Sequence, residues 1–541
     1  MKFIGILSAF FAVVSATVAQ NSGEFAPVPP PSQPQTQAGA QPAPPSRPSS
    51  PPSAAGTNAP AGRPMTMADC IQAALAHNFD VQVQRLNPQI SLYNLDAAYS
   101  GYDPSLSASG QHSYSVTPGT YSSIIGGVTP SSVSDANSFK TGLGGLLPWG
   151  LQYNLSGNAS ESYGRKISFD TNGLPVRSAF DSSSSSVGLT LTQPLLKNFW
   201  IDSTRLNIRV AKNRLKYSEQ GLRQQLITSV TAVANAYYEL IYAQQNVQVQ
   251  QTALALAQTQ LDQDNQRVQI GTLAILSVQQ DESQVAQSRA NLIAAQSTLD
   301  TDQNTLKNLL TDSYSQWHDT DIRPAESLLA PFETFDLQES WTKGMAQRPD
   351  LLQAKLNVEQ EGIQLKYSRN QLLPELDLTG SYGFTGSGRE FDNTLDATGE
   401  GNAPFYTYGA QLTVPLGNLG PRNQYKATKA ALQQIELQFK QLEQNILVVI
   451  DNAVKQAQSN YESVQATKQA RVYAEAALDA ETKTYAVGKA TTFEVLTYQN
   501  NLTAARSQEI RALANYNEAL ANLAQQEGAT LERFNINIEA K

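Results

Sequence analysis

The sequence is short of the residues from which catalytic and metal sites are usually built. Its 541 residues include one cysteine, Cys70, and three widely separated histidines, His77, His112 and His318. A single cysteine cannot form an internal disulfide and has no partners for a metal cluster. The sequence also lacks the HExxH, GxSxG and glycine-rich phosphate-loop motifs. We therefore expect a protein that is not an enzyme and that has no metal site and no cofactor.

Charged residues are scarce as well. They make up 16 % of the chain, the net charge is −9 and the pI is about 5.1. Domains that bind nucleic acid are usually basic, so we expect no nucleic-acid partner. Gln, Asn, Ser and Thr replace the missing charges, and this composition suits a surface that is polar without being strongly charged.

The only long apolar run lies at the N-terminus. Lys2 precedes "FIGILSAFFAVV", and the small residues of "ATVA" (Ala16–Ala19) follow. This pattern is typical of a cleavable secretory signal peptide over residues 1–19. A single membrane anchor is the alternative, although the run is short for a membrane span. Residues 20–64 are rich in Pro, Ala, Ser and Gln, which predicts a disordered linker.

The remaining chain is an internal duplication, with repeats over residues 65–325 and 326–534 and a tail over 535–541. The capping-box pair Thr66 and Asp69 recurs 270 residues later as Asp336 and Glu339. The same offset places Cys70 opposite a serine, so we expect it to be a small packing residue. Further along, "RVQIGTLAILSV" (267–278) recurs as "YAVGKATTFEVL" (485–496). Each repeat reads as helix, strands, long helix, glycine turn and returning helix.

The strand segments alternate apolar with small or polar residues, as strands between lipid and water do. They lie at 104–116 and 185–195 in the first repeat and at 374–384 and 406–416 in the second. The first repeat also contains about fifty additional residues between its two strand segments. Two alternating runs around Pro148, Trp149 and Gly150 predict an additional hairpin there.

Heptad spacing of apolar residues predicts long helices packed as coiled coils. In the first repeat the series is Leu226, Val233, Leu240, Val247, Leu254, Leu261 and Val268, and it resumes at Val278. The first long helix is expected over about 205–270, which is ~100 Å at ~1.5 Å per residue. Gly271 and Gly488 are expected to end the long helices in the left-handed conformation that glycine adopts at low cost.

These motifs and their duplication resemble the TolC-like outer-membrane efflux protein family. The matching segments include "TMADCIQAALAHN", "AYYELIYAQQNV", "RPDLLQAKLNVE", "LLPELDLTGSYG", both strand ends in "PL" and both glycine turns. The resemblance implies a membrane α+β fold in which a homotrimer shares one outer-membrane β-barrel. A long periplasmic α-helical barrel of coiled-coil hairpins continues that barrel in the family.

By the same resemblance, the protein is a passive exit duct of a tripartite efflux or type I secretion system. The implied partners are outer-membrane lipid, a periplasmic adaptor (membrane fusion protein) and an inner-membrane pump of RND, ABC or MFS type. The alternatives are a periplasmic coiled-coil adaptor or scaffold and a surface adhesin.

The resemblance also assigns the site residues. The adaptor-docking tips are the two glycine turns, with Gly271, Thr272, Leu273, Gly488, Lys489 and Ala490. Where the family has "V-D-V-L-D" after the second turn, this chain has "F-E-V-L-T", so Glu494 keeps one acid and Thr497 replaces the other. Ser277 and Asp281 follow the first turn, and these four residues are the implied gate or constriction. The alternatives are a plain hairpin turn and, for Glu494, a solvated helix face.

Overall fold

The computed structural model of the protein describes residues 62–123, 126–171 and 174–536. The predicted signal peptide and nearly all of the predicted linker lie outside these residues. The described chain divides into a sheet unit, residues 103–194 and 377–411, and a helical unit with residues 62–102, 195–376 and 412–536.

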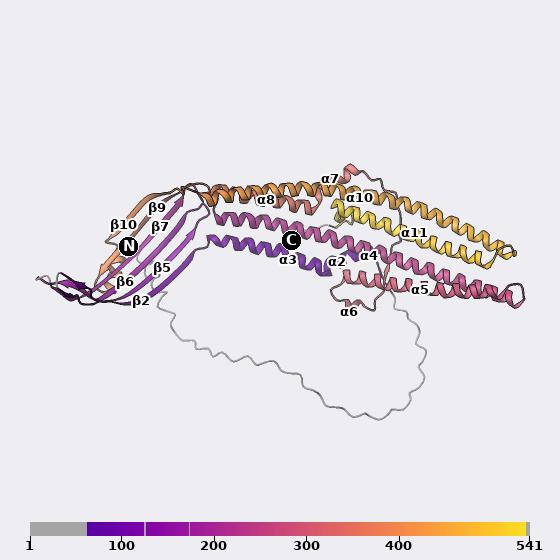
Figure 1. Ribbon diagram of the computed structural model, residues 1–541, viewed down its shortest axis with the longest axis horizontal. Helices are drawn as coiled ribbons and strands as arrows, with labels where there is room; N and C mark the ends of the chain where they lie inside the picture. Colours follow the sequence, from indigo (N-terminus) through magenta and orange to yellow (C-terminus); the bar gives the residue numbers. More distant parts are fainter. Residues whose placement is uncertain (1–61, 124–125, 172–173, 537–541) are drawn as a thin grey trace, which may run out of the picture. The chain divides into compact units, whose positions relative to one another are not determined.

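Six strands form one sheet in the described part of the sheet unit, in the order β10-β9-β7-β6-β5-β2 (Figure 1). They are β2 (Ser105–Thr117), β5 (Ser132–Leu146), β6 (Gln152–Phe169), β7 (Pro175–Pro194), β9 (Glu375–Gly388) and β10 (Pro404–Thr413). The pairs from β2 to β9 are antiparallel. Two short strands, β3 (Tyr121–Ser122) and β4 (Gly127–Val128), pair separately beyond β2. All four predicted strand segments are therefore confirmed.

The sheet has one apolar and one polar face at the level where β2 begins, as the alternation predicts. One row of paired residues across five strands consists of Leu106, Leu143, Leu155, Leu189 and Tyr382. The adjacent row points to the opposite face and consists of Ser105, Gly144, Asn154, Thr190 and Ser381. Leu106 and Tyr382 are exposed, so the apolar row is not covered by the rest of the chain. This pattern suits a sheet with lipid on one side and water on the other.

The predicted additional hairpin is confirmed, and it is part of the sheet. Strands β5 and β6 lie between β2 and β7, joined by a tight turn at 147–151. Leu147 N–H donates to Leu151 O over 2.8 Å, and Gly150 has a φ of 91°. The extra residues of the first repeat therefore add two strands to the sheet.

A helix that the sequence did not predict, α9 (Phe391–Glu400), follows β9. Ser185 on β7 donates to Thr394 O over 2.9 Å, and the rings of Phe139 and Phe391 meet edge to face at 5.8 Å. The helix therefore packs on the sheet next to β5 and β7. Its ten residues are too few for the periodicity that identified the long helices.

The helical unit consists of two long hairpins with shorter helices alongside (Figure 1). The first hairpin is α4 (Ser203–Gln269) with α5 (Ile275–Leu310), and the second is α10 (Leu419–Ala486) with α11 (Thr492–Glu527). The shorter elements are α2 (Met67–His77), α3 (Phe79–Tyr99), η1 (Ser100–Tyr102), α6 (Tyr314–Trp317), α7 (Leu337–Gln347), α8 (Pro349–Asn370) and α12 (Thr530–Arg533). The bounds of α4 agree with the heptad prediction. No helix in the described residues is both long and apolar enough to cross a membrane.

The core of the helical unit packs where the two repeats meet. Strand β1 (Arg63–Met65), which includes the last two residues of the predicted linker, pairs in parallel with β8 (Ile322–Pro324). Tyr237 is fully buried and donates to Met65 O over 3.0 Å. Cys70 is fully buried in the same core, as expected for a packing residue, and burial raises the pKa of its thiol to about 12. Such a thiol is unreactive at neutral pH.

Candidate gate at the helix turns

The two long helices end in the same backbone motif. Gly271 has a φ of 78° and Gly488 a φ of 76°. Thr272 N–H donates to Arg267 O over 2.9 Å, and at the other turn Lys489 N–H donates to Thr484 O over 3.1 Å. Each of these is the six-to-one bond of a Schellman motif, with the glycine in the left-handed position. The sequence prediction for both glycines is confirmed.

The returning helices begin differently. Thr491 is the N-cap of α11, and its hydroxyl accepts from Glu494 N–H over 3.3 Å. The Glu494 carboxylate accepts in return from Thr491 N–H over 2.7 Å, which lowers the pKa of Glu494. The equivalent N-cap of α5 is Ala274, which provides no side-chain bond. Only the second turn therefore has a capping box.

The gate residues expected from the sequence fall into two environments. Ser277 and Asp281 lie on α5, and Glu494 and Thr497 lie on α11. Glu494 and Thr497 are exposed, whereas Asp281 is fully buried. The structure therefore does not bring Asp281 to the exposed surface that Glu494 occupies. The expected docking residues lie in the two turns, and their role stays a prediction.

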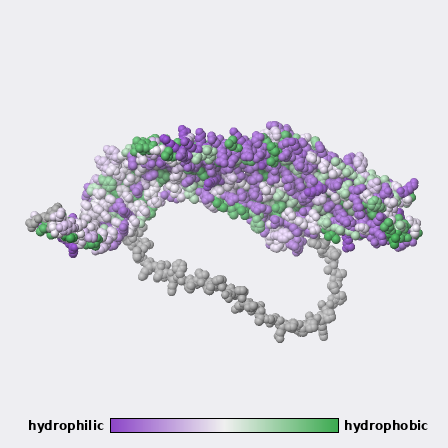
Figure 2. All heavy atoms as spheres, viewed as in Figure 1, coloured by the Kyte–Doolittle hydropathy of each residue, from purple (hydrophilic) through white to green (hydrophobic). Residues whose placement is uncertain are grey.

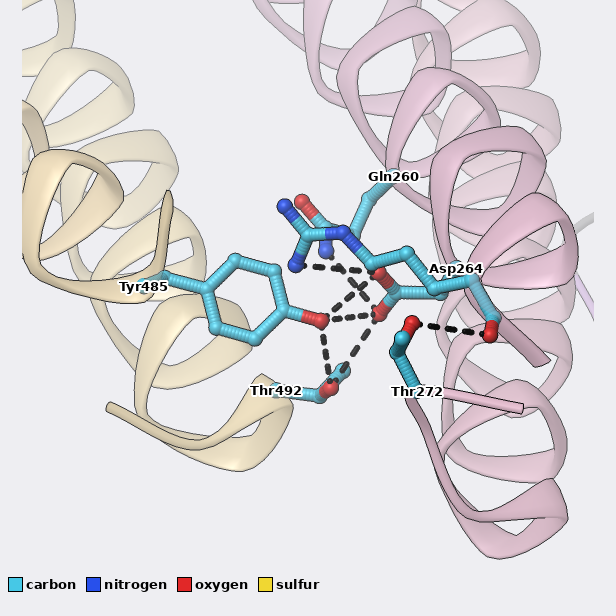
Figure 3. Close-up of polar contacts among 6 residues, drawn as sticks. Gln260, Asp264, Thr272, Tyr485 and Thr492 are labelled. Atoms are coloured by element: carbon cyan, nitrogen blue, oxygen red, sulfur yellow. Dashed lines mark hydrogen bonds and ion pairs between the residues drawn. The ribbon is translucent and has the colours of Figure 1, made fainter. Parts of the chain in front are cut away.

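A buried hydrogen-bond network next to the turns joins the two hairpins (Figure 3). Its centre is Asp264 on α4, whose carboxylate is fully buried. Tyr485 on α10 donates its phenolic hydroxyl to this carboxylate, with distances of 2.6 and 2.7 Å to the two oxygens. Thr492 on α11 donates over 3.1 Å, and Gln260 on α4 donates over 3.0 Å. One carboxylate thus holds three helices together.

A guanidinium completes this network. Arg267 on α4 lies over the Tyr485 ring at 4.5 Å from its centroid, and its Nη1 is 3.9 Å from an Asp264 oxygen. Its backbone carbonyl accepts from the Thr272 hydroxyl over 3.0 Å, which connects the network to the first turn (Figure 3). Stacking and charge therefore hold Tyr485 in place from the α4 side.

Asp281 on α5 faces the same carboxylate. Burial and the nearby negative charge of Asp264 raise the pKa of Asp281 to about 7. In the described residues, no donor lies within hydrogen-bond distance of either oxygen of Asp281. Two buried carboxyl groups this close favour the state in which one of them is protonated.

Sequence reasoning missed Asp264, Gln260, Arg267, Tyr485 and Thr492, although one signal was present. Asp264 follows the heptad residue Leu261 by three positions, and Asp281 follows Val278 by three. That spacing places both acids on the apolar seam of the helices. An acid close to a helix C-terminus is also unfavourable next to the helix dipole, so Asp264 needs donors from elsewhere.

The returning helices α5 and α11 form a shallow groove beside this network. It has a volume of about 380 Å³ and is lined mainly by amide side chains together with Phe493, Leu496 and Thr497. Gln284 and Asn500 exchange two hydrogen bonds across it, over 2.8 and 3.0 Å. These exposed polar contacts between α5 and α11 thus complement the buried link.

Comparison with known proteins identifies the family. The model of the family described as "Outer membrane efflux protein" matches residues 150–311 and 343–529, more than half of the chain. The chain belongs to the outer membrane efflux protein family. It is therefore an outer-membrane protein of a transport family, in agreement with the sequence resemblance.

The curated relatives and solved structures agree with this assignment. The outer membrane protein TolC of Vibrio cholerae is 25 % identical over 360 residues, which cover 63 % of this chain and 78 % of the relative. TolC of Escherichia coli is also 25 % identical over 360 residues, covering 64 % and 70 %. The crystal structure of VceC from Vibrio cholerae has a TM-score of 0.61 at 17 % identity, covering 85 % of this chain and 96 % of that one. The likeness to this structure supports the fold.

Proposed function

We propose that the protein is the exit duct of a tripartite efflux or type I secretion system, gated at the two helix turns. It conducts substrates passively, while an inner-membrane pump and a periplasmic adaptor supply cargo and energy. The observation that supports the gate most directly is the buried link from Asp264 to Tyr485 and Thr492. This link fixes one hairpin against the other, so opening the end of the duct requires breaking it.

Assembly from three copies would complete the sheet. The outer edges of β2 and β10 have no partner strand in the described residues. Unpaired backbone groups at a sheet edge are costly in lipid. Thr379 Oγ1 donates to Gly409 O and Thr385 N–H donates to Ala403 O, so β10 runs antiparallel to β9. The strands β2 and β10 therefore have opposite directions within the six-stranded order, and β2 of one copy can pair antiparallel with β10 of the next. We propose that each copy contributes six strands, including the hairpin β5–β6, to one continuous sheet.

The turns are the proposed docking surface for the adaptor. Exposed apolar side chains gather there: Ile270, Ile275, Leu276, Val487 and Phe493. In the view of Figure 2, hydrophilic residues cover most of the long helices, whereas hydrophobic residues are visible at the α4–α5 turn. Apolar patches at the end of a polar rod suit binding to a partner protein.

The gate is tested by Tyr485→Phe, which removes the hydroxyl from the buried link. We expect several-fold higher single-channel conductance in planar bilayers, because the hairpins separate more easily. Tyr473→Phe is the matched control, since Tyr473 lies on the same helix and is 68 % exposed. Equal conductance of the Tyr485→Phe and Tyr473→Phe variants would contradict the gate.

Glu494 is the proposed acidic residue of the constriction. It is exposed and its pKa is lowered by the bond from Thr491 N–H, so it is ionised at neutral pH. Three copies in a narrow pore would attract cations. We expect Glu494→Gln to reduce cation selectivity, measured as the reversal potential in a salt gradient. Glu462→Gln, at an exposed position of α10, should leave it unchanged, and an unchanged potential in both variants would rule out the assignment.

A further inference from the structure

The environment of Asp281 does not suit an ionised carboxylate. Its side chain is fully buried, and in the described part of the chain neither of its oxygens has a hydrogen-bond donor. The group that it faces is the carboxyl of Asp264, which already accepts from Tyr485, Thr492 and Gln260. If both acids were ionised, two acceptors would meet without a hydrogen between them, at a large cost in desolvation.

The groups of the network around Asp281 come from three helices, and the titratable or charged ones are on α4 and α10. From α4, Asp264 contributes a carboxyl and Arg267 a guanidinium at 3.9 Å from Asp264. From α10, Tyr485 contributes a phenol whose pKa is raised by burial, so it remains a neutral donor. From α11, the residue that reaches the network is the uncharged Thr492. Two carboxyls and one guanidinium leave one negative charge in excess, and one proton neutralises it.

We propose that Asp264 and Asp281 form a proton-binding site that ties the first hairpin to the second when it is occupied. In the occupied state, the Asp281 hydroxyl donates to the Asp264 carboxylate, and the described donors hold the other lone pairs of Asp264. When the proton leaves to solvent, two buried carboxylates repel each other and the link to Tyr485 and Thr492 loosens. The proposal rests on the proposed gate and adds a chemical signal that controls it.

The direction of the pH effect follows from the pKa of Asp281, which is raised from 3.8 to about 7. The folded link binds the proton more tightly than the separated helices do. Its stability is therefore highest below pH 4, falls as the pH rises from about 4 to about 7, and is constant above that. We expect the link to be tighter at pH 5.5 than at pH 8.5.

Hydrogen exchange of the full-length protein in detergent tests the proposal. The readout is the exchange rate of residues 483–496, compared between wild type and Asp281→Asn at each pH so that intrinsic exchange cancels. The Asn amide donates to Asp264 as the protonated acid does. We expect the ratio of the wild-type rate to the Asp281→Asn rate to rise roughly thirtyfold between pH 5.5 and pH 8.5, because wild type loses a factor of ten per pH unit up to about pH 7 and Asp281→Asn loses none. Asp300→Asn, at an exposed position of α5, should behave as wild type at both pH values.

Three results would overturn the proposal. The first is a ratio of wild-type to Asp281→Asn rates that does not change with pH. The second is full protection of wild type at pH 8.5 by 5 mM CaCl₂, which would indicate a cation in place of the proton. The third result concerns Asp264→Asn, which also removes one carboxyl and replaces Asp281→Asn if that variant fails to fold. If the exchange rate of Asp264→Asn keeps the pH dependence of wild type, the pair of Asp264 and Asp281 is not the proton site.

Hydrogen exchange tests the proton site, whereas single-channel conductance tests the gate, so the two proposals can fail independently. A pH-dependent exchange ratio supports the proton site even when Tyr485→Phe leaves conductance unchanged, and in that case only the gate fails. A pH-independent ratio together with higher conductance of Tyr485→Phe retains the gate and rejects the proton site.

Discussion

The turn between α4 and α5 and the turn between α10 and α11 have the same backbone but different side chains. Both end in a Schellman motif, with Gly271 and Gly488 at equivalent positions. The first hairpin contributes two buried acids, Asp264 and Asp281, whose equivalents in the second repeat are Glu481 and Tyr498. The second hairpin contributes the donors Tyr485 and Thr492 together with a capping box.

This difference shows how a duplicated fold makes a contact between its own copies. Two identical ends would place acid against acid or hydroxyl against hydroxyl. Because one copy provides the acceptor and the other the donors, the copies bind each other instead of repelling. Both repeats keep the same backbone turn because the chain must reverse direction after each long helix, whereas the side chains of the two turns have become complementary.

The largest effect is expected from removing the shared acceptor. Asp264→Ala leaves Tyr485, Thr492 and Gln260 without their buried acceptor, and hydrogen bonds to charged groups contribute about 1.5–3 kcal/mol each before reorganisation. We expect the hairpin ends to open more easily by about 3 kcal/mol, measured by hydrogen exchange of residues 483–496 at pH 5.5. Glu481→Ala, at the equivalent position of the second repeat, should change the free energy of opening by less than about 0.5 kcal/mol. Similar effects of both substitutions would mean that the two ends are not specialised.

The next largest effect should be equal at the two ends, because the backbone motif is shared. A β-branched residue in the left-handed conformation costs about 1–2 kcal/mol. We expect Gly271→Val and Gly488→Val to destabilise their own hairpin by about this amount, although a side chain at either position meets no atom within 4 Å. Thermal unfolding followed by circular dichroism measures both. Gly362 lies in the middle of α8 with free space around it, so Gly362→Ala should instead stabilise the folded protein by about 0.5–1 kcal/mol.

Local patterns of the sequence predicted the elements and the turns. The heptads specify α4 because the spacing of apolar residues along one helix is a local property. Gly271 and Gly488 were predicted from the need for a positive φ, which is also local. The alternation around Pro148 and Trp149 predicted the hairpin β5–β6 for the same reason. These predictions needed no knowledge of which segments meet in space.

The pairings between distant segments were not predictable in this way. Asp264 and Tyr485 are 221 residues apart, and nothing in either heptad indicates that they meet. The position of β5 and β6 between β2 and β7 depends on strand pairing, which alternation alone does not determine. Asp281 was predicted as a gate residue from the resemblance, but its burial follows from the packing of α5 against α4.

A smaller effect should distinguish the starts of the returning helices. Thr491→Ala removes the N-cap bond of α11 and should cost about 1 kcal/mol of local stability. The reciprocal change, Ala274→Thr, introduces an N-cap at α5 and should gain a similar amount, because Ala274 already has the extended conformation of an N-cap. Hydrogen exchange of the first turn of each helix measures both. A loss of stability on Ala274→Thr would show that the first turn requires an uncapped helix start.

The smallest effect concerns a surface ion pair that only the second hairpin has. Lys483 lies 2.6 Å from Asp479 one helical turn earlier, and both side chains are well exposed. The equivalent residues of the first hairpin are Gln266 and Asp262, so Gln266→Lys would create the same pair. Exposed pairs at this spacing contribute only a few tenths of a kcal/mol and are screened by salt. We therefore expect Lys483→Gln and Gln266→Lys to change exchange near the turns slightly, in opposite directions, at low salt. A larger change that persists in 0.5 M NaCl would indicate that Lys483 contacts more than the solvated face of α10.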